Sequence, residues 1–513
     1  MAKLLPLWLF VFALAVRLLL AAVLGLDGLY GQDAFAYIGC AHEILQVQHS
    51  GVTPCTDFYW PLGYPLLAAF FVLVTHAEPL GAQLASMVTG AAIAPLAYWM
   101  VVEGGVAGTA RRDASSSGVA AGLIAALCGT LMLSSIVVMS DAPGLFWATL
   151  SACLLLRWDS NASDGPAQSL WFLLAAVALA LAVVTRWIFA GLLLPFGVFA
   201  ALTSLRRLRT ARSQGAVVPH KSIVLALLPW AGAVIAFMLV VVPQLYFNSH
   251  SGYPLSSDGW IVNWSAANAW RTSLDGPGGH VDYRLPPFIF NAEPLFHPNY
   301  IFPLLSPCVL YGAWQLRRSP ALVLLGGWIV TLYLYLIGAG QENMRFGLAF
   351  FTPVAVLAGV GIFSMPMRLR PRAPDSARRW LLLVISLALA IPFSYRVIAA
   401  FSSAVALQFS AIRYLQSLVP PASTVVTFEL SISLQYYTGF SIVDLFAQSP
   451  DSLRRLVCRN NRAYLYVDSS KLESQWAGKS PGENFHWLRD RIGLTRVGQQ
   501  GAWTLYQIRP CSQ

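Results

Sequence analysis

The residues LLPLWLFVFALAVRLLLAAVLGLDGLYGQDAFAY, numbered 4–37, decide the fold of this chain. The run from 4 to 26 is apolar apart from Arg17 and is long enough to cross a bilayer as one helix. It resembles a secretory signal peptide only loosely, because it is long, contains Arg17 and has no clear small-residue cleavage site. The sequence therefore predicts a retained first transmembrane helix, with Asp33 immediately after it at the membrane surface.

The composition excludes a soluble globular protein of this length. Of 513 residues, 57% are hydrophobic and only 11% are charged. In lipid, a spanning segment must satisfy its own backbone hydrogen bonds, and the apolar runs of roughly 17 to 25 residues fit helices rather than barrel strands. We therefore predict an α-helical polytopic membrane protein.

The basic residues mark the membrane topology. A net charge of +10 could suggest nucleic acid as a partner, but the charge gathers in short loops between apolar runs. Such clusters are typical of cytoplasmic loops. They consist of Arg111 and Arg112, then Arg206, Arg207, Arg209, Arg212 and Lys221, then Arg317 and Arg318, then Arg368, Arg370, Arg372, Arg378 and Arg379. We expect no nucleic-acid partner.

About eleven transmembrane helices reproduce this alternation, with the amino terminus in the cytoplasm and the carboxyl terminus outside. The expected spans are 4–26, 82–103, 118–138, 142–157, 170–185, 187–205, 222–247, 299–316, 320–338, 346–366 and 380–400. The run Tyr64–Thr75 is apolar but short, so we expect it to lie in or dip into the interface.

The topology divides the chain into a transmembrane domain, 1–400, and an exoplasmic domain, 401–513. The transmembrane domain has two large exoplasmic segments, 27–81 with an interfacial helix over about 34–48, and the irregular loop 248–298. The tail is more polar. It has alternating runs at 423–428, 463–467 and 502–508, and a helical pattern over 449–459, which together predict a small α/β domain.

Four of the seven cysteines are exoplasmic on this topology. Cys40 with Cys55, and Cys458 with Cys511, could each close a disulfide in an oxidising compartment. Cys128, Cys153 and Cys308 lie in or beside spans, where a small buried apolar residue is expected.

Several short motifs follow one another in order. They are Asp33 with Tyr37 four residues on, Pro61–Leu66 with Tyr64, Ser140-Asp141-Ala142-Pro143, Thr185-Arg186, Pro243–Pro254, Asn343–Pro353 with Arg345, and Tyr436–Gly439 in the tail. In this order the chain resembles the GT-C superfamily of integral-membrane glycosyltransferases, within it the protein O-mannosyltransferase and aminoarabinose-transferase-like group. The resemblance spans nearly the whole length.

The resemblance implies a polyprenyl-phosphate-linked sugar as donor and an exoplasmic hydroxyl of a lipid, glycan or protein as acceptor. Transfer would usually invert the anomeric carbon. A phosphate leaving group needs no general acid, but the acceptor hydroxyl loses a proton as it attacks, and a carboxylate can accept it. Asp33 is the candidate base. Its alternative role is that of a helix N-cap, because it stands at the start of the expected interfacial helix.

The other candidate site residues lie at the exoplasmic ends of spans. Asp141 begins a span, where Asp-Ala-Pro is also a natural helix start, and the resemblance places this acid in the catalytic site. Arg345 and Arg186 are candidates for gripping the phosphate, or alternatively anchor the span ends at the interface. Tyr37, Tyr64 and Glu342 complete the expected substrate-binding set.

Two further features are ambiguous. His42, Glu43 or His297 could help hold a divalent metal ion, but family members often carry a second acid beside the loop acid, whereas Gln32 and Ala34 flank Asp33 here. No cofactor is therefore required, although a divalent ion is possible. Four exoplasmic tryptophans could stack on sugar rings or belong to the interfacial aromatic belt, namely Trp60, Trp260, Trp264 and Trp270.

The sequence thus predicts a membrane-bound glycosyltransferase, with the short loops favouring a bacterial inner membrane and a periplasmic or extracellular tail. Two alternatives are a non-catalytic glycolipid-binding subunit and a lipid-linked sugar transporter or flippase. A transporter normally shows internal repeats and ionisable residues near the middle of the bilayer. Here Asp33, Asp141 and Glu342 all lie at the exoplasmic rim of the expected spans.

Overall fold

The computed structural model describes residues 4–50, 53–56, 58–102, 111–160, 166–213, 220–250, 262–276, 278–366, 375–458 and 462–509. These residues form two compact units. Unit 1 comprises residues 1–28, 37–270 and 286–398, and unit 2 comprises residues 29–36, 271–285 and 399–513, within which the described residues lie. Two long helices, α2 and α16, contribute residues to both units.

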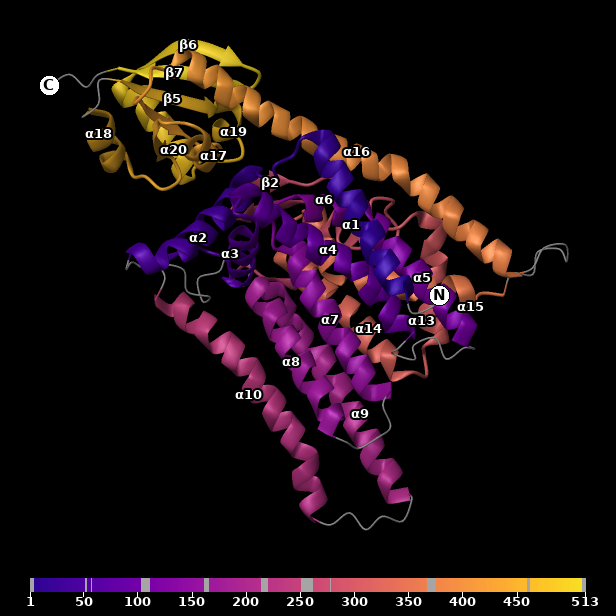
Figure 1. The fold of residues 1–513 in the computed structure, drawn as a ribbon. Coiled ribbons are helices and arrows are strands. Elements are labelled where there is room, and N and C mark those ends of the chain that lie inside the picture. Colours follow the sequence, from indigo (N-terminus) through magenta and orange to yellow (C-terminus); the bar gives the residue numbers. More distant parts are fainter. Residues whose placement is uncertain are drawn as a thin grey trace. The chain divides into compact units, whose positions relative to one another are not determined.

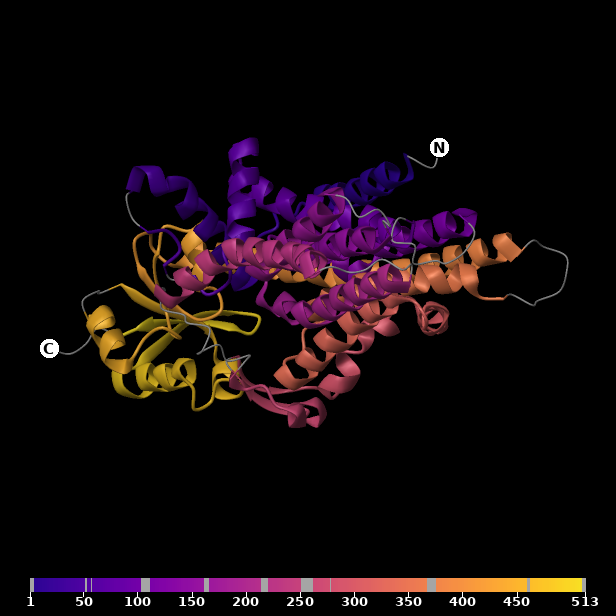
Figure 2. The ribbon, with the colours of Figure 1, turned by 90° about the horizontal axis from the view of Figure 1, so that it is seen from below.

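Unit 1 is helical. Its long helices are α1 (Leu5–Leu24), α2 (Gly31–Ser50), α3 (Gly63–Thr75), α4 (Glu78–Val102), α5 (Arg111–Leu127), α6 (Gly129–Ile136), α7 (Asp141–Ser160), α8 (Pro166–Thr185), α9 (Leu193–Ser213), α10 (His220–His250), α13 (Ser306–Gln315), α14 (Pro320–Ala339), α15 (Phe351–Ser364) and α16 (Asp375–Leu418). Shorter turns connect them: η2 (Trp187–Leu192), η4 (Ala266–Trp270), α12 (Pro287–Phe290), η5 (Glu293–Leu295), η6 (Pro303–Leu305) and η7 (Met344–Phe350). Helix α8 packs against both α7 and α10, and α7 to α10 run alongside one another in both views (Figures 1 and 2).

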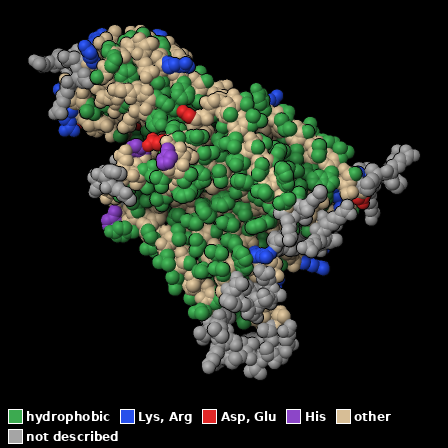
Figure 3. All heavy atoms as spheres, in the orientation of Figure 1, with side chains coloured by type: hydrophobic (Ala, Val, Ile, Leu, Met, Phe, Trp, Pro, Cys, Tyr) green, Lys and Arg blue, Asp and Glu red, His purple; other side chains and the backbone are tan. Residues whose placement is uncertain are grey.

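The described helices are long and apolar enough for seven membrane crossings, or eight if α5 and α6 count as one broken span. These crossings correspond to the expected spans 4–26, 82–103, 118–138, 187–205, 222–247, 320–338, 346–366 and 380–400. The visible face over these helices consists mostly of hydrophobic side chains (Figure 3). The protein is therefore an integral membrane protein, as its composition indicates.

Three expected spans differ from this set. Helix α7 covers 142–157 and α8 covers 170–185, but neither counts among the seven; the apolar part of α8 is short, at Ser169–Thr185. The region expected as 299–316 contains only η6 and α13, and α13 has 10 residues. Ten helical residues span about 15 Å, half the thickness of the hydrocarbon core. Pro303 and Pro307 lack backbone N–H groups and confine regular helix to the segment after residue 305.

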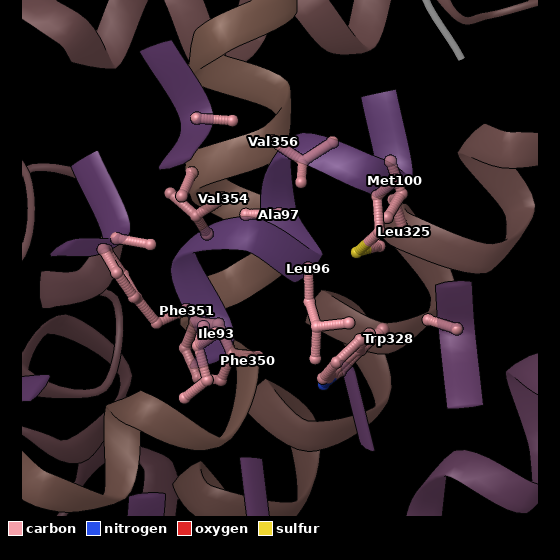
Figure 4. Close-up of a cluster of buried hydrophobic side chains, with 14 of the residues drawn as sticks. Ile93, Leu96, Ala97, Met100, Leu325, Trp328, Phe350, Phe351, Val354 and Val356 are labelled. Atoms are coloured by element: carbon pink, nitrogen blue, oxygen red, sulfur yellow. The ribbon is translucent and has the colours of Figure 1, made fainter. Parts of the chain in front are cut away.

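The core of unit 1 is close-packed around α4, α14 and α15. Met100 and Leu96 of α4 lie beside Leu325 and Trp328 of α14, and Ile93 of α4 lies beside Phe351 of α15 (Figure 4). The indole Nε1 of Trp328 donates to the carbonyl of Ala349, 2.8 Å away, so the one polar atom of this side chain is satisfied.

One charged side chain lies within this core. Arg17, in the middle of α1, is fully buried and donates to the carbonyls of Ala13 at 2.9 Å and Ala126 at 3.3 Å. Ala126 lies at the carboxyl end of α5, where carbonyls have no partner inside the helix and a cation is favourable. Among the described residues, its Nε and Nη2 atoms have no hydrogen-bond partner.

Unit 2 contains a small α/β domain. Its strands β3 (Thr424–Thr427), β4 (Ser441–Asp444), β5 (Ala463–Asp468), β6 (Leu494–Gln500) and β7 (Trp503–Ile508) form one sheet in the order β4-β3-β5-β7-β6. Strands β4, β3 and β5 are parallel, whereas β7 and β6 are antiparallel to their neighbours. A separate hairpin joins β1 (Ser273–Gly276) and β2 (Gly279–Asp282).

The sheet of unit 2 has a hydrophobic core on each face. On one face, β3, β5 and β7 pack on the end of α16 and on α17 (Ser431–Tyr437), through Leu415 and Leu434. On the other face, Val426 and Leu465 pack on three helices, α18 (Pro450–Cys458), α19 (Ser469–Glu473) and α20 (Ser480–Trp487). The strands and the helix expected in the tail are confirmed.

Candidate functional site

The site in unit 1 is built around Asp141. This residue begins α7, where Pro143 in the first turn requires no backbone donor, and it is only 4% exposed. Its Oδ1 atom accepts a hydrogen bond from Nη1 of Arg186, the extended residue that follows α8. Its Oδ2 atom is buried and has no partner among the described residues. The arrangement leaves one carboxylate oxygen available to a ligand.

A second arginine lies beside the first. The side chain of Asn343 caps η7 by accepting from the backbone N–H of Arg345 at 3.2 Å, and Nη1 of Arg345 contacts Sδ of Met139 at 2.7 Å. Both guanidinium groups lie over the ring of Phe346, Arg186 at 5.3 Å and Arg345 at 5.4 Å from its centroid. We call Asp141, Arg186, Arg345 and Phe346 the arginine cluster. It holds two fixed positive charges beside one buried carboxylate, so it favours an anionic ligand.

The two candidate tyrosines are buried next to this cluster. Tyr37 shares a hydrogen bond of 2.7 Å with Ser140, the residue before Asp141. Tyr64 bonds Ser86 at 2.8 Å and donates to the carbonyl of Ala82 at 3.0 Å. Their rings lie edge to face, with centroids 4.8 Å apart. Both hydroxyl groups are therefore engaged by protein atoms, and the pair supports the start of α7.

Asp33 lies in the first turn of α2, is half-buried, and belongs to unit 2. Within that unit, the backbone N–H of Gly31 donates to Gln408 of α16 at 3.5 Å, and the ring of Phe35 contacts those of Tyr436 and Tyr437. The turn that carries Asp33 is thus held by α16 and α17. The structure brings Asp141, Arg186, Arg345, Tyr37 and Tyr64 together in unit 1, while Asp33 is described within unit 2.

Glu342 lies just before η7, in unit 1, and η5, which carries a second carboxyl group on Glu293, packs against η7. Burial raises the pKa of Glu293 to about 7. Burial and, secondarily, the charge of Glu293 raise the pKa of Glu342 to about 7. Sequence analysis missed Glu293; its one signal is a lone carboxyl group inside the mostly apolar run Asn291–Phe296.

The residues considered as metal ligands have other partners. His42 pairs with Glu78, the Oε2 atom of Glu43 accepts from the backbone of Cys55 at 2.6 Å, and Nδ1 of His297 accepts from the backbone of Asn299 at 3.3 Å. In the described part of the chain, no three His, Cys, Asp or Glu side chains are grouped so as to hold a metal ion. Burial lowers the pKa of His297, which favours its neutral form.

The cysteines and tryptophans expected on the exoplasmic side differ in what the structure shows of them. The disulfide between Cys40 and Cys55 is confirmed, and the pairing expected for Cys458 involves Cys511, which lies outside the described residues. Trp60 packs on Tyr37, and Trp264 donates to the carbonyl of Tyr335 at 3.0 Å. Trp270 is exposed beside Phe288, and Trp260 also lies outside the described residues.

An apolar cavity of about 410 Å³ lies between α3, α7, α8 and α10. Its lining includes Leu66, Phe70, Trp147, Val184 and Val240, and Thr185, the residue before Arg186, also lines it. Gly63 keeps α3 close to α8 here, because a Cβ atom at this position would lie 2.5 Å from the carbonyl oxygen of Val184. A hydrophobic chain in this cavity would thus lie beside the arginine cluster.

The chain is similar to known glycosyltransferases. The model of the family described as dolichyl-phosphate-mannose-protein mannosyltransferase matches residues 67–248, which include Asp141 and Arg186. No curated protein matches the chain by sequence.

The structural comparisons extend over nearly the whole chain. The apo crystal structure of ArnT from Cupriavidus metallidurans matches with a TM-score of 0.63 and 14% identity, covering 98% of this chain and 97% of ArnT. The structure of the same protein bound to undecaprenyl phosphate matches with a TM-score of 0.60 and 13% identity, covering 98% of each chain. The oligosaccharyltransferase AglB from Archaeoglobus fulgidus, in complex with an inhibitory peptide and a dolichol phosphate, matches with a TM-score of 0.53 and 13% identity, covering 97% of this chain and 74% of AglB.

Proposed function

From the GT-C fold that these comparisons show, we propose that the protein is a glycosyltransferase that moves a sugar from a polyprenyl-phosphate donor to a hydroxyl group on the exoplasmic side of the membrane. One observation carries the proposal: two guanidinium groups share the ring of Phe346 beside Asp141, next to an apolar cavity in the membrane-spanning unit. A polyprenyl phosphate has the matching parts, a charged phosphate and a long hydrophobic chain.

Arg345 and Arg186 would bind the phosphate of the donor and stabilise it as it leaves. A guanidinium group donates two parallel hydrogen bonds to two phosphate oxygens, and the negative charge on those oxygens grows as the bond to the sugar breaks. The cavity beside Thr185 would take the first isoprenoid units. The acidic Asp141 would fix Arg186 and offer its second oxygen to the substrate.

Asp33 is the proposed general base. The acceptor oxygen attacks the anomeric carbon, the bond from that carbon to the phosphate oxygen breaks, and the hydroxyl proton passes to the Asp33 carboxylate. A single carboxylate is sufficient because the phosphate leaves as an anion without a proton. The proposal specifies neither the acceptor class nor the sugar, and it allows a divalent ion. We place the reaction at the outer face of a bacterial inner membrane, with the side taken from the charge distribution of the loops and the bacterial membrane from the shortness of those loops.

The first test is sugar transfer by the purified protein from a panel of polyprenyl-phosphate sugars to candidate lipid, glycan and peptide acceptors. Asp33→Asn should lower kcat by about 100-fold or more, since loss of a general base typically costs that much. The exposed neighbour Gln32→Ala is the matched control and should keep its activity. Transfer that is equally fast in Asp33→Asn would contradict the role of Asp33, and donor binding without transfer by any form would indicate a binding subunit.

A further inference from the structure

Two carboxyl groups near η7 have hydrogen-bonding capacity that the protein does not use. Glu293 is only 8% exposed, and its Oε2 atom is buried without a partner among the described residues. The Oε1 atom of Glu342 is likewise buried without a hydrogen-bond partner among the described residues. Neither of the two side chains forms an ion pair within the described ranges. An unpaired buried acceptor destabilises the free protein, so these atoms are suited to receive donors from a ligand.

The two groups act as a pair. The short helix η5, which carries Glu293, packs against η7, and Glu342 stands two residues before the start of η7, so both carboxyl groups belong to segments that meet at η7. Burial raises the pKa of each carboxyl group to about 7, so near neutral pH each is partly protonated. A protonated carboxyl group donates one hydrogen bond, and the ionised group only accepts. Together, a protonated and an ionised carboxyl group offer a ligand both a hydrogen-bond donor and acceptors.

The pair lies next to the arginine cluster in unit 1. Gly347 follows Phe346, and a Cβ atom on this glycine would lie 2.6 Å from Pro294, the residue after Glu293, and 2.7 Å from the hydroxyl of Tyr300. Unfilled acceptor atoms are therefore present on Asp141 at the start of α7, on Glu293 in η5 and on Glu342 just before η7, all within unit 1.

The chemistry of these atoms identifies a class of ligand. Buried acceptor atoms without partners, on carboxyl groups that can also carry a proton, call for a molecule with several hydroxyl groups, each able to donate and accept. In the described part of the chain no three acidic, histidine or cysteine side chains are grouped so as to hold a metal ion. A sugar attached to a phosphate held by Arg345 would supply such hydroxyl groups.

We propose that Glu293 and Glu342 bind the hydroxyl groups of the sugar carried by the donor and thereby select it, an inference that rests on the proposed function. The pair holds the sugar ring while the arginine cluster holds the phosphate. Glu293 is then a specificity-determining residue with no contact to the lipid chain.

The test compares two probes, undecaprenyl phosphate and undecaprenyl-phosphate mannose, in equilibrium binding to the full-length protein. Glu293→Gln and Glu342→Gln should each weaken binding of the glycosylated lipid about tenfold, the effect of losing one good hydrogen bond to a charged group. Both variants should bind sugar-free undecaprenyl phosphate like the wild type. Glu473→Gln removes an exposed carboxylate of unit 2 and should bind both probes normally.

Three outcomes would overturn the inference. Equal weakening for both lipids, or no weakening, would show that the pair does not recognise the sugar. A preference for the glycosylated lipid that disappears on chelation would show a metal site instead. Failure of the wild type to bind either lipid would contradict the proposed function itself, and a single cooperative melting transition for each variant separates these results from misfolding.

Discussion

At the scale of single residues, the site depends on how two arginines are fixed. Arg186 is oriented by Asp141, whereas Arg345 is oriented through its backbone by the cap of Asn343 and through its side chain by Met139 and Phe346. The sequence predicted both arginines because each follows or precedes an apolar run at the end expected to face the exoplasm. It did not predict that Phe346 joins them, because that contact depends on helices far apart in the chain.

Arg345→Ala should raise the KM for the polyprenyl-phosphate sugar by about 10- to 100-fold, because a hydrogen-bonded charge pair to phosphate is lost. Arg345→Lys should recover part of the affinity, since lysine keeps the charge but not the fork geometry. A donor titration measures both. Arg317→Ala, at an exposed arginine that contacts Trp314, is the control, and an unchanged donor requirement in Arg345→Ala would exclude a phosphate role.

The raised pKa values of Glu293 and Glu342 predict a pH-dependent stability. Their pKa is about 7 in the folded protein, against 4.5 as the ordinary value, so the folded state holds protons that the unfolded state releases. Their stabilising contribution is therefore complete below about pH 4.5 and is lost as the pH rises through 7. In the ligand-free protein, the melting temperature should fall between pH 5 and pH 8, and Glu293→Gln should flatten that profile. If the melting temperature of Glu293→Gln fell with rising pH as steeply as that of the control Glu473→Gln, Glu293 would not be the origin of the pH dependence.

At the scale of elements, sequence patterns predicted most helices within a few residues. The apolar runs at 4–26 and 82–103 became α1 and α4, because length and hydropathy alone determine a membrane helix. The run at 118–138 was expected as one span, but it bends by 55° between α5 and α6. The backbone N–H of Thr130 donates to the carbonyl of Asn299 at 3.1 Å instead of continuing α5. A local pattern cannot reveal a partner so distant in the chain.

The disulfide between Cys40 and Cys55 ties α2 to the segment that carries Phe58 and Trp60. These rings pack on Tyr37, which bonds Ser140 beside Asp141. Replacing both cysteines by alanine should destabilise the protein by about 3 kcal/mol, from the 15-residue separation, and should lower transfer activity. The rate of thermal inactivation, with and without reductant, measures how much this disulfide stabilises the protein. Reductant should speed inactivation of the wild type more than that of the double variant, and an equal effect on both would point to another disulfide.

At the scale of the whole molecule, the distribution of basic loops predicts that the amino terminus and the loop at Arg317 and Arg318 face the cytoplasm, and that the tail faces outward. Single cysteines at Arg318→Cys and Val497→Cys, both at exposed positions, test this. A membrane-impermeant maleimide applied to intact cells should label Val497→Cys only. Permeabilised cells provide the control in which both should react, and labelling of Arg318→Cys in intact cells would invert the topology.

The buried Arg17 has a consequence for the biogenesis of the protein. An arginine at the centre of a spanning helix costs roughly 2.5–3.5 kcal/mol on insertion, which the surrounding leucines and valines of α1 offset. Its carbonyl acceptor on Ala126 is synthesised 109 residues later. At about 5–20 residues per second, α1 waits roughly 5–20 s in the bilayer before that acceptor emerges from the ribosome. During this interval the guanidinium of Arg17 has only the carbonyl of Ala13 as an acceptor in lipid, so α1 gains its second acceptor, and with it a firmer place in the bilayer, only when α5 arrives.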